Sequence, residues 1–284
     1  MEARVQRRVQ RYGWDLAATA YEALWHAQLA PAHEALLEAA APAPGERVLD
    51  VACGSGALAL RGADAVGATG RVLGVDLSGA MVAEATRRAR ARGIGHAAFL
   101  RMDAERLDVD DASVDVALCA FGLMYVPDPA QAIAEMHRVA RPGGRVVVAV
   151  WGRAARCGFA PLFQVVEAEV ASDVCPLFFR LGEPDALARL CTDAGLAPVS
   201  ERRIAASVVH ADADEACNAA FLAGPVALAW SRFDDHVRAR LRARYLDAIA
   251  RWRDGRGYRL PAEFVVVAAR ACRTASARCQ TAAA

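Results

Sequence analysis

The chain has 284 residues, 55% of them hydrophobic, and a formal net charge of +1. This length suits one large domain or a domain with a lid, and the near-neutral charge gives no electrostatic reason to expect nucleic acid or an anionic membrane as partner. Scattered cysteines without a Cys-x-x-Cys pair, no signal-peptide pattern and no run near the roughly 18 apolar residues of a spanning helix predict a cytoplasmic protein.

An amphipathic helix is predicted over residues 14–40, and Pro42, Pro44 and Gly45 end it, so residues 1–45 are expected to form an N-terminal helical cap. Strand and helix patterns then alternate, which is typical of a mostly parallel sheet covered on both faces. The predicted strands cover residues 46–52, 71–76, 97–101, 114–120, 145–151, 198–209 and 259–270. Helices are predicted between these strands. The first ends at residue 66, and the others cover residues 79–92, 129–140 and 184–194.

The main domain is expected to span residues 46–270. Two inserts, 153–181 and 211–254, are expected to form a lid over the acceptor, and residues 271–284 a disordered tail. Ser78 is predicted to cap the helix over 79–92, and capping boxes are predicted at Asp128 with Gln131 and at Asp212 with Glu215. The Arg-rich stretch 238–244 is interpreted as a solvated helix face rather than a nucleic-acid site.

The most informative motif is VLDVACGSG at residues 48–56. It places a glycine loop between a buried strand and a helix, whose free N–H groups favour an anionic group. Asp76 ends the next strand, where an acid can accept both hydroxyls of a ribose. Together they predict an adenosine-bearing cofactor. The loop alone also fits a nicotinamide dinucleotide or a plain tight turn.

Three further features separate these cofactors. Asp103 follows the strand 97–101, where it could bond an adenine amino group; a Pro-Gly-Gly turn at 142–144 leads into a central strand; and Asp50 lies inside the loop motif. On VLDVACGSG (48–56), VLGVDLSGAMVAEA (72–85), RMDAERL (101–107) and the block 114–151, the chain resembles class I S-adenosylmethionine-dependent methyltransferases of the ubiquinone/menaquinone-biosynthesis-like group. The resemblance covers residues 46–151.

The resemblance implies an α/β fold, a doubly wound, Rossmann-like, seven-stranded and mostly parallel sheet with an antiparallel last strand and helical lid inserts. It implies S-adenosylmethionine as cofactor, with no metal, and methylation at oxygen or carbon of a small hydrophobic or aromatic metabolite, in quinone or secondary metabolism. The residues that it assigns to the cofactor are Asp50, Ala52, Gly54, Gly56, Asp76, Leu77, Met81, Asp103, Ala104 and Ala120.

Within that set, Asp50 and the loop backbone would line the methionine moiety and Asp76 the ribose. Leu77 and Met81 would pack on the adenine, and Asp103 with Ala104 would contact its edge. The family more often has glycine at position 52. Each residue also has a structural alternative: a cap for Asp103, the core for Met81 and an ordinary strand-end acid for Asp76.

The acceptor pocket is expected to be lined by aromatic and apolar residues, each of which could instead be ordinary core: Tyr21, Trp25, Phe121, Met124, Tyr125 and Trp151. Candidates for a general base are His26, His210 and Tyr21, although such a base is optional in methyl transfer. No acidic cluster follows the fourth strand and no His-Glu-x-x-His element occurs, so no metal is expected.

Two other functions stay open. A nicotinamide-dependent oxidoreductase would share the glycine loop, although the Pro-Gly-Gly block argues against it. The same fold could also act without methyl transfer, as a cyclase or a ligand-binding module. The expected partner is a small-molecule acceptor, with at most a second copy of the chain in a homodimer; nucleic acid and membrane insertion are not expected.

Overall fold

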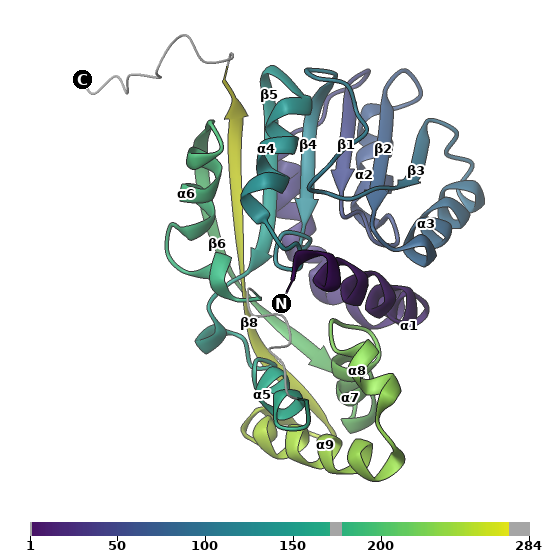
Figure 1. Ribbon diagram of the computed structural model, residues 1–284, viewed down its shortest axis with the longest axis vertical. Helices are drawn as coiled ribbons and strands as arrows, with labels where there is room; N and C mark the ends of the chain where they lie inside the picture. Colours follow the sequence, from purple (N-terminus) through teal and green to yellow (C-terminus); the bar gives the residue numbers. More distant parts are fainter. Residues whose placement is uncertain (1, 171–177, 273–284) are drawn as a thin grey trace.

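The strands of the computed structural model, which describes residues 2–170 and 178–272, form one sheet in the order β3-β2-β1-β4-β5-β8-β6, with a short β7 paired to β8 (Figure 1). Their bounds are β1 Arg47–Val51, β2 Arg71–Asp76, β3 Ala97–Arg101, β4 Val114–Ala120, β5 Ala140–Trp151, β6 Leu196–His210, β7 Arg253–Asp254 and β8 Gly257–Ala271.

The strands β1 to β5 pair in parallel, and β8 runs antiparallel between β5 and β6. The carboxyl ends of β1, β2, β3 and β4 therefore meet at one edge of the sheet, where ligands bind in open α/β sheets. The predicted seven-stranded, mostly parallel sheet with an antiparallel last strand is confirmed, and the two-residue β7 adds to it.

The helices of the described residues are α1 Ala3–Ala40, α2 Ala57–Val66, α3 Gly79–Ala91, α4 Pro129–Val139, α5 Pro161–Glu167, α6 Ala186–Asp193, α7 Ala213–Phe221, α8 Ala227–Arg232 and α9 Asp235–Ala248, with 3₁₀ turns η1 Ala154–Arg156, η2 Arg180–Gly182 and η3 Ala250–Trp252. The helix α1 begins eleven residues before the predicted start at residue 14. Its first turns are rich in Arg and Gln, which favour helix but leave no apolar stripe to read.

Both faces of the sheet are buried. In β5, Val146, Val148 and Val150 belong to the core under α4 and α6, whereas Val147 and Ala149 belong to the core under α2, α3 and the end of α1. Alternate side chains of a strand point to opposite faces, so a strand covered on both sides is apolar throughout. This arrangement explains why β5 reads as an unbroken hydrophobic run.

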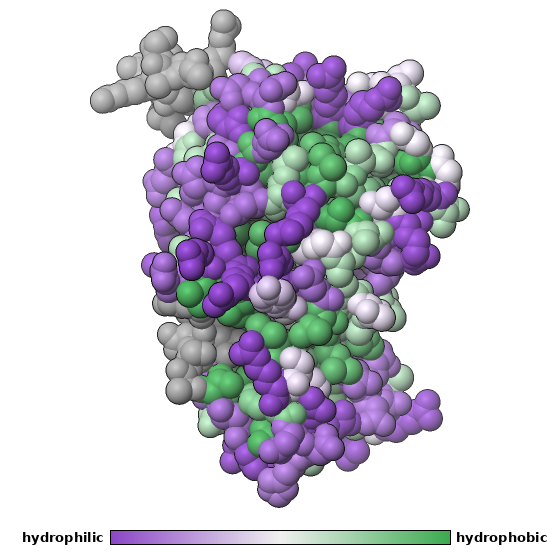
Figure 2. Space-filling view, turned by 45° about the vertical axis from the view of Figure 1, so that its right-hand side comes forward, coloured by the Kyte–Doolittle hydropathy of each residue, from purple (hydrophilic) through white to green (hydrophobic). Residues whose placement is uncertain are grey.

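A second part of the molecule, which we call the lower lobe, is built on the far halves of two long strands. Strands β6 and β8 stay paired from Leu196↔Ala271 to His210↔Tyr258, and their far halves carry α5, α7, α8 and α9 (Figure 1). The first half of α1 lies between this lobe and the sheet. Hydrophobic residues gather at the surface where the two parts meet (Figure 2).

Side-chain caps start α3, α4 and α7 as predicted. Ser78, Asp128 and Asp212 accept backbone N–H bonds from the third residue after each. The predicted capping box at Gln131 was wrong, because its side chain donates to the Glu105 carbonyl at 3.4 Å instead.

The Arg-rich face of α9 is paired with acids: Arg240 and Arg244 with Glu169, and Arg242 with Asp214. None of the described helices combines the length and the low polarity needed to cross a bilayer. The tail expected at 271–284 lies, from residue 273 onward, outside the described residues, as do residues 171–177 of the first insert.

Candidate functional site

The loop between β1 and α2 exposes its backbone to a deep cavity. Ala52 and Gly54 have φ angles of 55° and 52°, in the left-handed region that glycine adopts without steric cost. A Cβ on Gly54 would have one neighbour within 4 Å, the Tyr21 ring at 3.9 Å. Both loop residues line the cavity, so a ligand can approach the main chain here.

Gly56 serves packing rather than the cavity. It is the N-cap residue of α2, and a Cβ at this position would lie 2.9 Å from the Cβ of Ala85 and 3.2 Å from the Phe99 ring. It is not among the residues that line the cavity. The absence of a side chain at this second glycine of the loop therefore lets α3 and β3 pack closely against it.

Asp76 ties the end of β2 to the loop. One carboxylate oxygen accepts the Gly54 N–H at 2.9 Å, and the other accepts the Ser78 N–H at 2.8 Å. Burial raises the pKa of Asp76, and these backbone hydrogen bonds oppose that shift. Each carboxylate oxygen can accept a second hydrogen bond, so Asp76, which lines the cavity, can also receive two hydroxyl donors.

Asp50 lies behind the loop. It is 1% exposed, and its Oδ2 has no hydrogen-bond partner among the described residues. Burial, and then the charge of Asp76, raise the pKa of Asp50 to about 8, so this carboxyl group is largely protonated at neutral pH. Contrary to the expectation of a lining residue, Asp50 does not reach the cavity surface.

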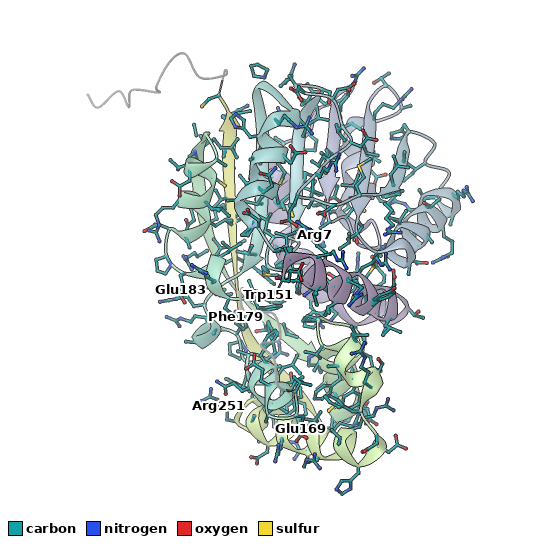
Figure 3. All side chains as sticks on the ribbon, viewed as in Figure 1. Arg7, Trp151, Glu169, Phe179, Glu183 and Arg251 are labelled. Atoms are coloured by element: carbon teal, nitrogen blue, oxygen red, sulfur yellow. The ribbon has the colours of Figure 1, made fainter. Side chains whose placement is uncertain are left out.

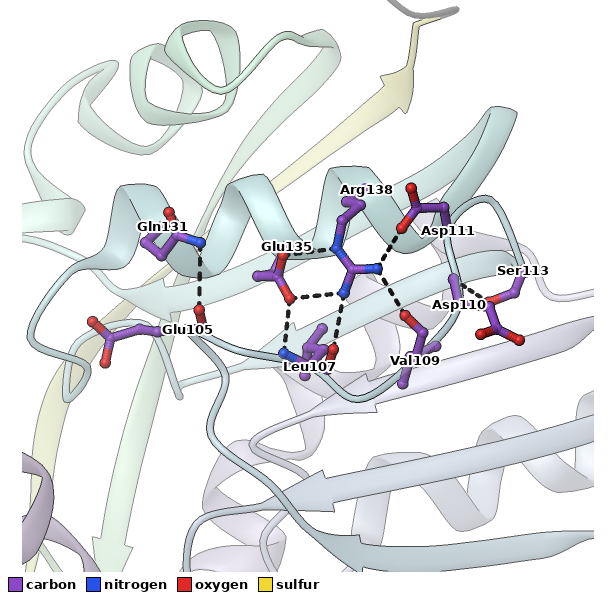
Figure 4. A network of polar contacts seen from close by, with 9 residues as sticks. All are labelled: Glu105, Leu107, Val109, Asp110, Asp111, Ser113, Gln131, Glu135 and Arg138. Carbon is purple, nitrogen blue, oxygen red and sulfur yellow. Dashed lines mark hydrogen bonds and ion pairs between the residues drawn. The ribbon is translucent and has the colours of Figure 1, made fainter.

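The connection between β3 and β4 supplies the next acid of the site, and Arg138 of α4 holds this connection in place (Figure 4). The Arg138 guanidinium donates to the carbonyl oxygens of Leu107 and Val109 at 2.9 and 2.8 Å, and to the carboxylates of Glu135 and Asp111. Its hydrogen bond to Glu135 lowers the pKa of that carboxyl. The planar guanidinium donates several hydrogen bonds in fixed directions, so it can hold in place a loop that pairs with no strand.

Asp103 lies at the start of this connection and lines the cavity. Its Oδ1 accepts the Glu105 N–H at 3.0 Å, and its Oδ2 lies 3.0 Å from Arg7 Nε. Arg7, from the first turns of α1, also donates to Glu105 at 2.7 Å. The acid at the expected adenine edge is thus already in contact with α1.

Two more polar contacts hold α1 across the site. Asp15 accepts the Ser78 hydroxyl at 2.6 Å, and Glu22 accepts the Ser55 hydroxyl at 2.6 Å. Arg88 of α3 lies 2.7 Å from the Glu22 carboxylate. The first half of α1 therefore covers the glycine loop and the carboxyl end of β2.

The other end of the cavity is aromatic. The ring centroid of Trp151, at the end of β5, lies 4.7 Å from that of Phe159, 5.4 Å from that of Phe121 and 5.9 Å from that of Trp25. Figure 3 labels Trp151 at the junction of the sheet and the lower lobe, below Arg7 of α1. Phe121 has a φ of 61°, an uncommon conformation for a bulky residue and one typical of functional loops.

Charge divides the cavity into two ends. The charged lining residues of the described chain are Arg7, Asp76, Asp103 and Glu105, all at the carboxyl ends of β2 and β3 or on the helix above them. The part beneath β4, β5 and the lower lobe is lined by apolar and aromatic side chains. The empty space of the cavity, counted together with its solvent-open mouth, is about 1140 Å³.

The cavity brings together most of the predicted site residues. Those expected at the cofactor that line it are Ala52, Gly54, Asp76, Leu77, Met81, Asp103, Ala104 and Ala120. Those expected at the acceptor that line it are Tyr21, Trp25, Phe121, Tyr125 and Trp151. Met124 does not, because its side chain is 1% exposed and packs into the core.

Of the three candidate bases, Tyr21 lines the cavity and the two histidines do not. His26 is half exposed and its Nδ1 lies 2.8 Å from Glu22, and neither it nor His210 lines the cavity. His210 is buried, which lowers its pKa, and its Nδ1 has no partner in the described part of the chain. Tyr21 does line the cavity, and burial raises its pKa, which favours the protonated phenol.

Sequence reasoning did not single out several lining residues, although it expected both inserts to cover the acceptor. From α1 these are Arg7, Gln10 and Trp14; from the first insert Phe159, Leu162, Phe163 and Phe178; and from the second Ala219, Ala220, Ala223, Gly224 and Pro225. A signal existed for Trp14, which is seven residues before Tyr21 and so on the same helix face. Its ring centroid lies 5.5 Å from that of Tyr21.

The first half of the chain is similar to known methyltransferases. Residues 48–144 match the model of a methyltransferase domain. The chain is 38% identical over 119 residues to demethylmenaquinone methyltransferase of Geobacillus kaustophilus, which covers 42% of this chain and 51% of the relative. It is 32% identical over 133 residues to aklanonic acid methyltransferase of Streptomyces sp. (strain C5), covering 47% of this chain and 60% of the relative.

The chain thus spans about half the length of the curated relatives it matches. Among solved structures, a candidate methyltransferase of Bacillus halodurans C-125 has a TM-score of 0.61 at 16% identity, over 85% of this chain and 99% of that one, which supports the fold. The predicted resemblance to methyltransferases is confirmed.

Proposed function

We propose that this chain is an S-adenosylmethionine-dependent methyltransferase acting on a small hydrophobic or aromatic metabolite, because residues 48–144 match the model of a methyltransferase domain. The observation that carries the proposal is one cavity with a polar end at the glycine loop and β2 and an aromatic end at β4, β5 and the lower lobe. A polar cofactor and an apolar acceptor can meet in such a cavity.

The polar end fits S-adenosylmethionine. The open main chain at Ala52 and Gly54 suits the methionine moiety, and the Asp76 carboxylate can accept the ribose hydroxyls. Leu77 and Met81 offer apolar surface to the adenine, and Asp103 retains acceptor capacity for its amino group. Asp50 supports the loop from behind, since its side chain is buried beneath it.

The cofactor supplies a methyl group bonded to a positively charged sulfur, which makes that carbon electrophilic. The chain aligns the acceptor, and α1 together with the lower lobe excludes water. No histidine lines the cavity among the described residues. We therefore propose an acceptor whose nucleophile needs no strong base, such as a phenol, an enol or a quinol.

The names of the relatives support this class of acceptor, since they refer to demethylmenaquinone and aklanonic acid. The test is incubation of the purified chain with methyl-labelled S-adenosylmethionine and a panel of quinols and aromatic polyketides. Label in an aromatic product is the expected result, and it should depend on Asp76. Cofactor binding without label in any product would favour the alternative of a cyclase or a ligand-binding module with the same fold.

A further inference from the structure

An exposed row of side chains follows the first half of α1. Arg4, Arg8, Tyr12 and Leu16 succeed each other at four-residue intervals, which places them on one ridge of the helix. All four are exposed, Tyr12 by 46% and Leu16 by 52%. The cavity is lined instead by residues of another helix face, such as Trp14.

Basic side chains gather at the N-terminal end of this ridge, around a surface hollow. The charged residues that line the hollow are Glu2, Arg4, Arg7, Arg8, Arg11 and Arg101. Arg7 is already paired with carboxylates. In the described part of the chain, no ion pair joins Arg4, Arg8, Arg11 or Arg101 to an acid, so the hollow carries a local excess of positive charge that the near-zero net charge conceals.

Exposed apolar groups accompany these arginines. The Arg11 guanidinium lies 4.5 Å from the centroid of the Tyr12 ring. Leu100, next to Arg101 on the edge strand β3, is 49% exposed. Unpaired arginines beside large exposed apolar side chains on one helix are the pattern of a helix that lies in a membrane interface.

We propose that the ridge Arg4–Arg8–Tyr12–Leu16 docks on the surface of an anionic lipid bilayer. The arginines contact lipid phosphates, and Tyr12 and Leu16 enter the boundary between headgroups and acyl chains. A soluble polyanion would match the arginines but would leave Tyr12 and Leu16 in water. The exposed Tyr12 and Leu16 side chains therefore favour a lipid surface over a soluble polyanion as the partner.

Docking through this ridge has a consequence for the cavity. The same turns of α1 that face the bilayer carry Trp14 and Arg7 on their cavity side. An apolar acceptor dissolved in the bilayer would then lie next to the helix that covers the site. This consequence rests on the proposed function, whereas the docking itself does not.

The test is co-sedimentation with vesicles of phosphatidylcholine mixed with phosphatidylglycerol, against vesicles of phosphatidylcholine alone, at low and high salt. Binding to the anionic vesicles that weakens with salt is expected. The variant R4Q/R8Q/R11Q should lose about a hundredfold in affinity, since each basic residue near an anionic surface contributes roughly a factor of five. The control R90Q/R232Q/R256Q removes the same charge from exposed arginines elsewhere that have no ion pair in the described chain, and should bind like the parent.

The variant Y12S/L16S separates a bilayer from other anions. It should weaken vesicle binding but leave binding to polyglutamate unchanged, and neither set of variants should alter the denaturation midpoint. Equal binding to neutral vesicles, no binding at low salt, or an equal loss in the control would overturn the proposal. The proposal would also be overturned if the protein bound polyglutamate as tightly as vesicles and if Y12S/L16S had no effect on vesicle binding. That result would assign the arginines to an acidic protein.

Discussion

The methyl group of Ala52 occupies the space that a side chain on Gly122 would need. Ala52 belongs to the glycine loop after β1 and Gly122 to the turn after β4, so the two loops that border the cavity are matched in size at this point. Ala52 holds a φ of 55°, which costs an alanine roughly 1 kcal/mol relative to glycine. The small departure from the family pattern at position 52 is therefore compensated at position 122.

The substitution Gly122→Ala should destabilise the protein by about 1–3 kcal/mol, because the new methyl group meets both Ala52 and, at 2.9 Å, the Cys119 sulfur. Adding Ala52→Gly should recover part of that loss. Urea denaturation of the two single variants and the double variant measures the coupling. Gly79→Ala is the control, since nothing lies within 4 Å of its new Cβ. Additive effects at positions 52 and 122 would show that the two residues do not share this space.

Asp76→Asn should weaken S-adenosylmethionine binding by about 1–3 kcal/mol, the scale of charged hydrogen bonds that are lost. The Asn amide has only one acceptor oxygen. The Asp76 carboxylate has two, and these accept two backbone N–H groups and can also accept two ribose hydroxyls. The control is Asp64→Asn, which removes a negative charge from an exposed acid paired with Arg92. Calorimetry on both variants separates the loss of the ribose contact from the loss of a negative charge in general. Equal affinities for Asp76→Asn and the parent protein would refute the ribose role.

Asp50 should make the protein less stable as the pH rises. Its pKa is about 8 in the folded state and near 3.9 in an unfolded chain, so its contribution is fully present below pH 4 or so and is lost as the pH approaches and passes 8. Asp50→Asn should remove this dependence. Denaturation at mildly acidic and mildly alkaline pH measures it. The same pH slope in the variant and the parent would place the titration elsewhere.

Arg138→Lys should loosen the connection between β3 and β4, because an ammonium cannot reproduce the planar fork to two carbonyls and two carboxylates. Arg138 is 31% exposed, and the expected destabilisation is about 1–2 kcal/mol. Hydrogen exchange of the Glu105 and Leu107 amides should accelerate. Arg92→Lys, in an exposed pair, is the control. Unchanged exchange at Leu107 would contradict the role given to Arg138.

Local chemistry was enough to predict most of the sheet and the polar end of the cavity. The strand ends at Asp76 and Ala120 follow from apolar runs, and the caps at Ser78 and Asp128 follow from side-chain acceptors three residues before a free N–H. These signals lie within a few residues of the structure that they specify. The glycine loop and its acid were predicted for the same reason.

Long-range packing decided the rest. Whether Phe159 or Met124 faces the cavity depends on how the lower lobe meets the sheet, which no local pattern contains. Gly56 looks like a ligand-loop glycine, but its neighbours Ala85 and Phe99 come from other elements. The first turns of α1 lack an apolar stripe, and their place over the site depends on pairs such as Arg7 with Asp103.

The most direct test of the proposed function is isothermal titration of the purified chain with S-adenosylmethionine, its demethylated product S-adenosylhomocysteine, and NAD. Both sulfur compounds should bind, one molecule per chain, and NAD should give no heat of binding. Binding of NAD alone, or no binding of either sulfur compound, would contradict the assignment of the cavity.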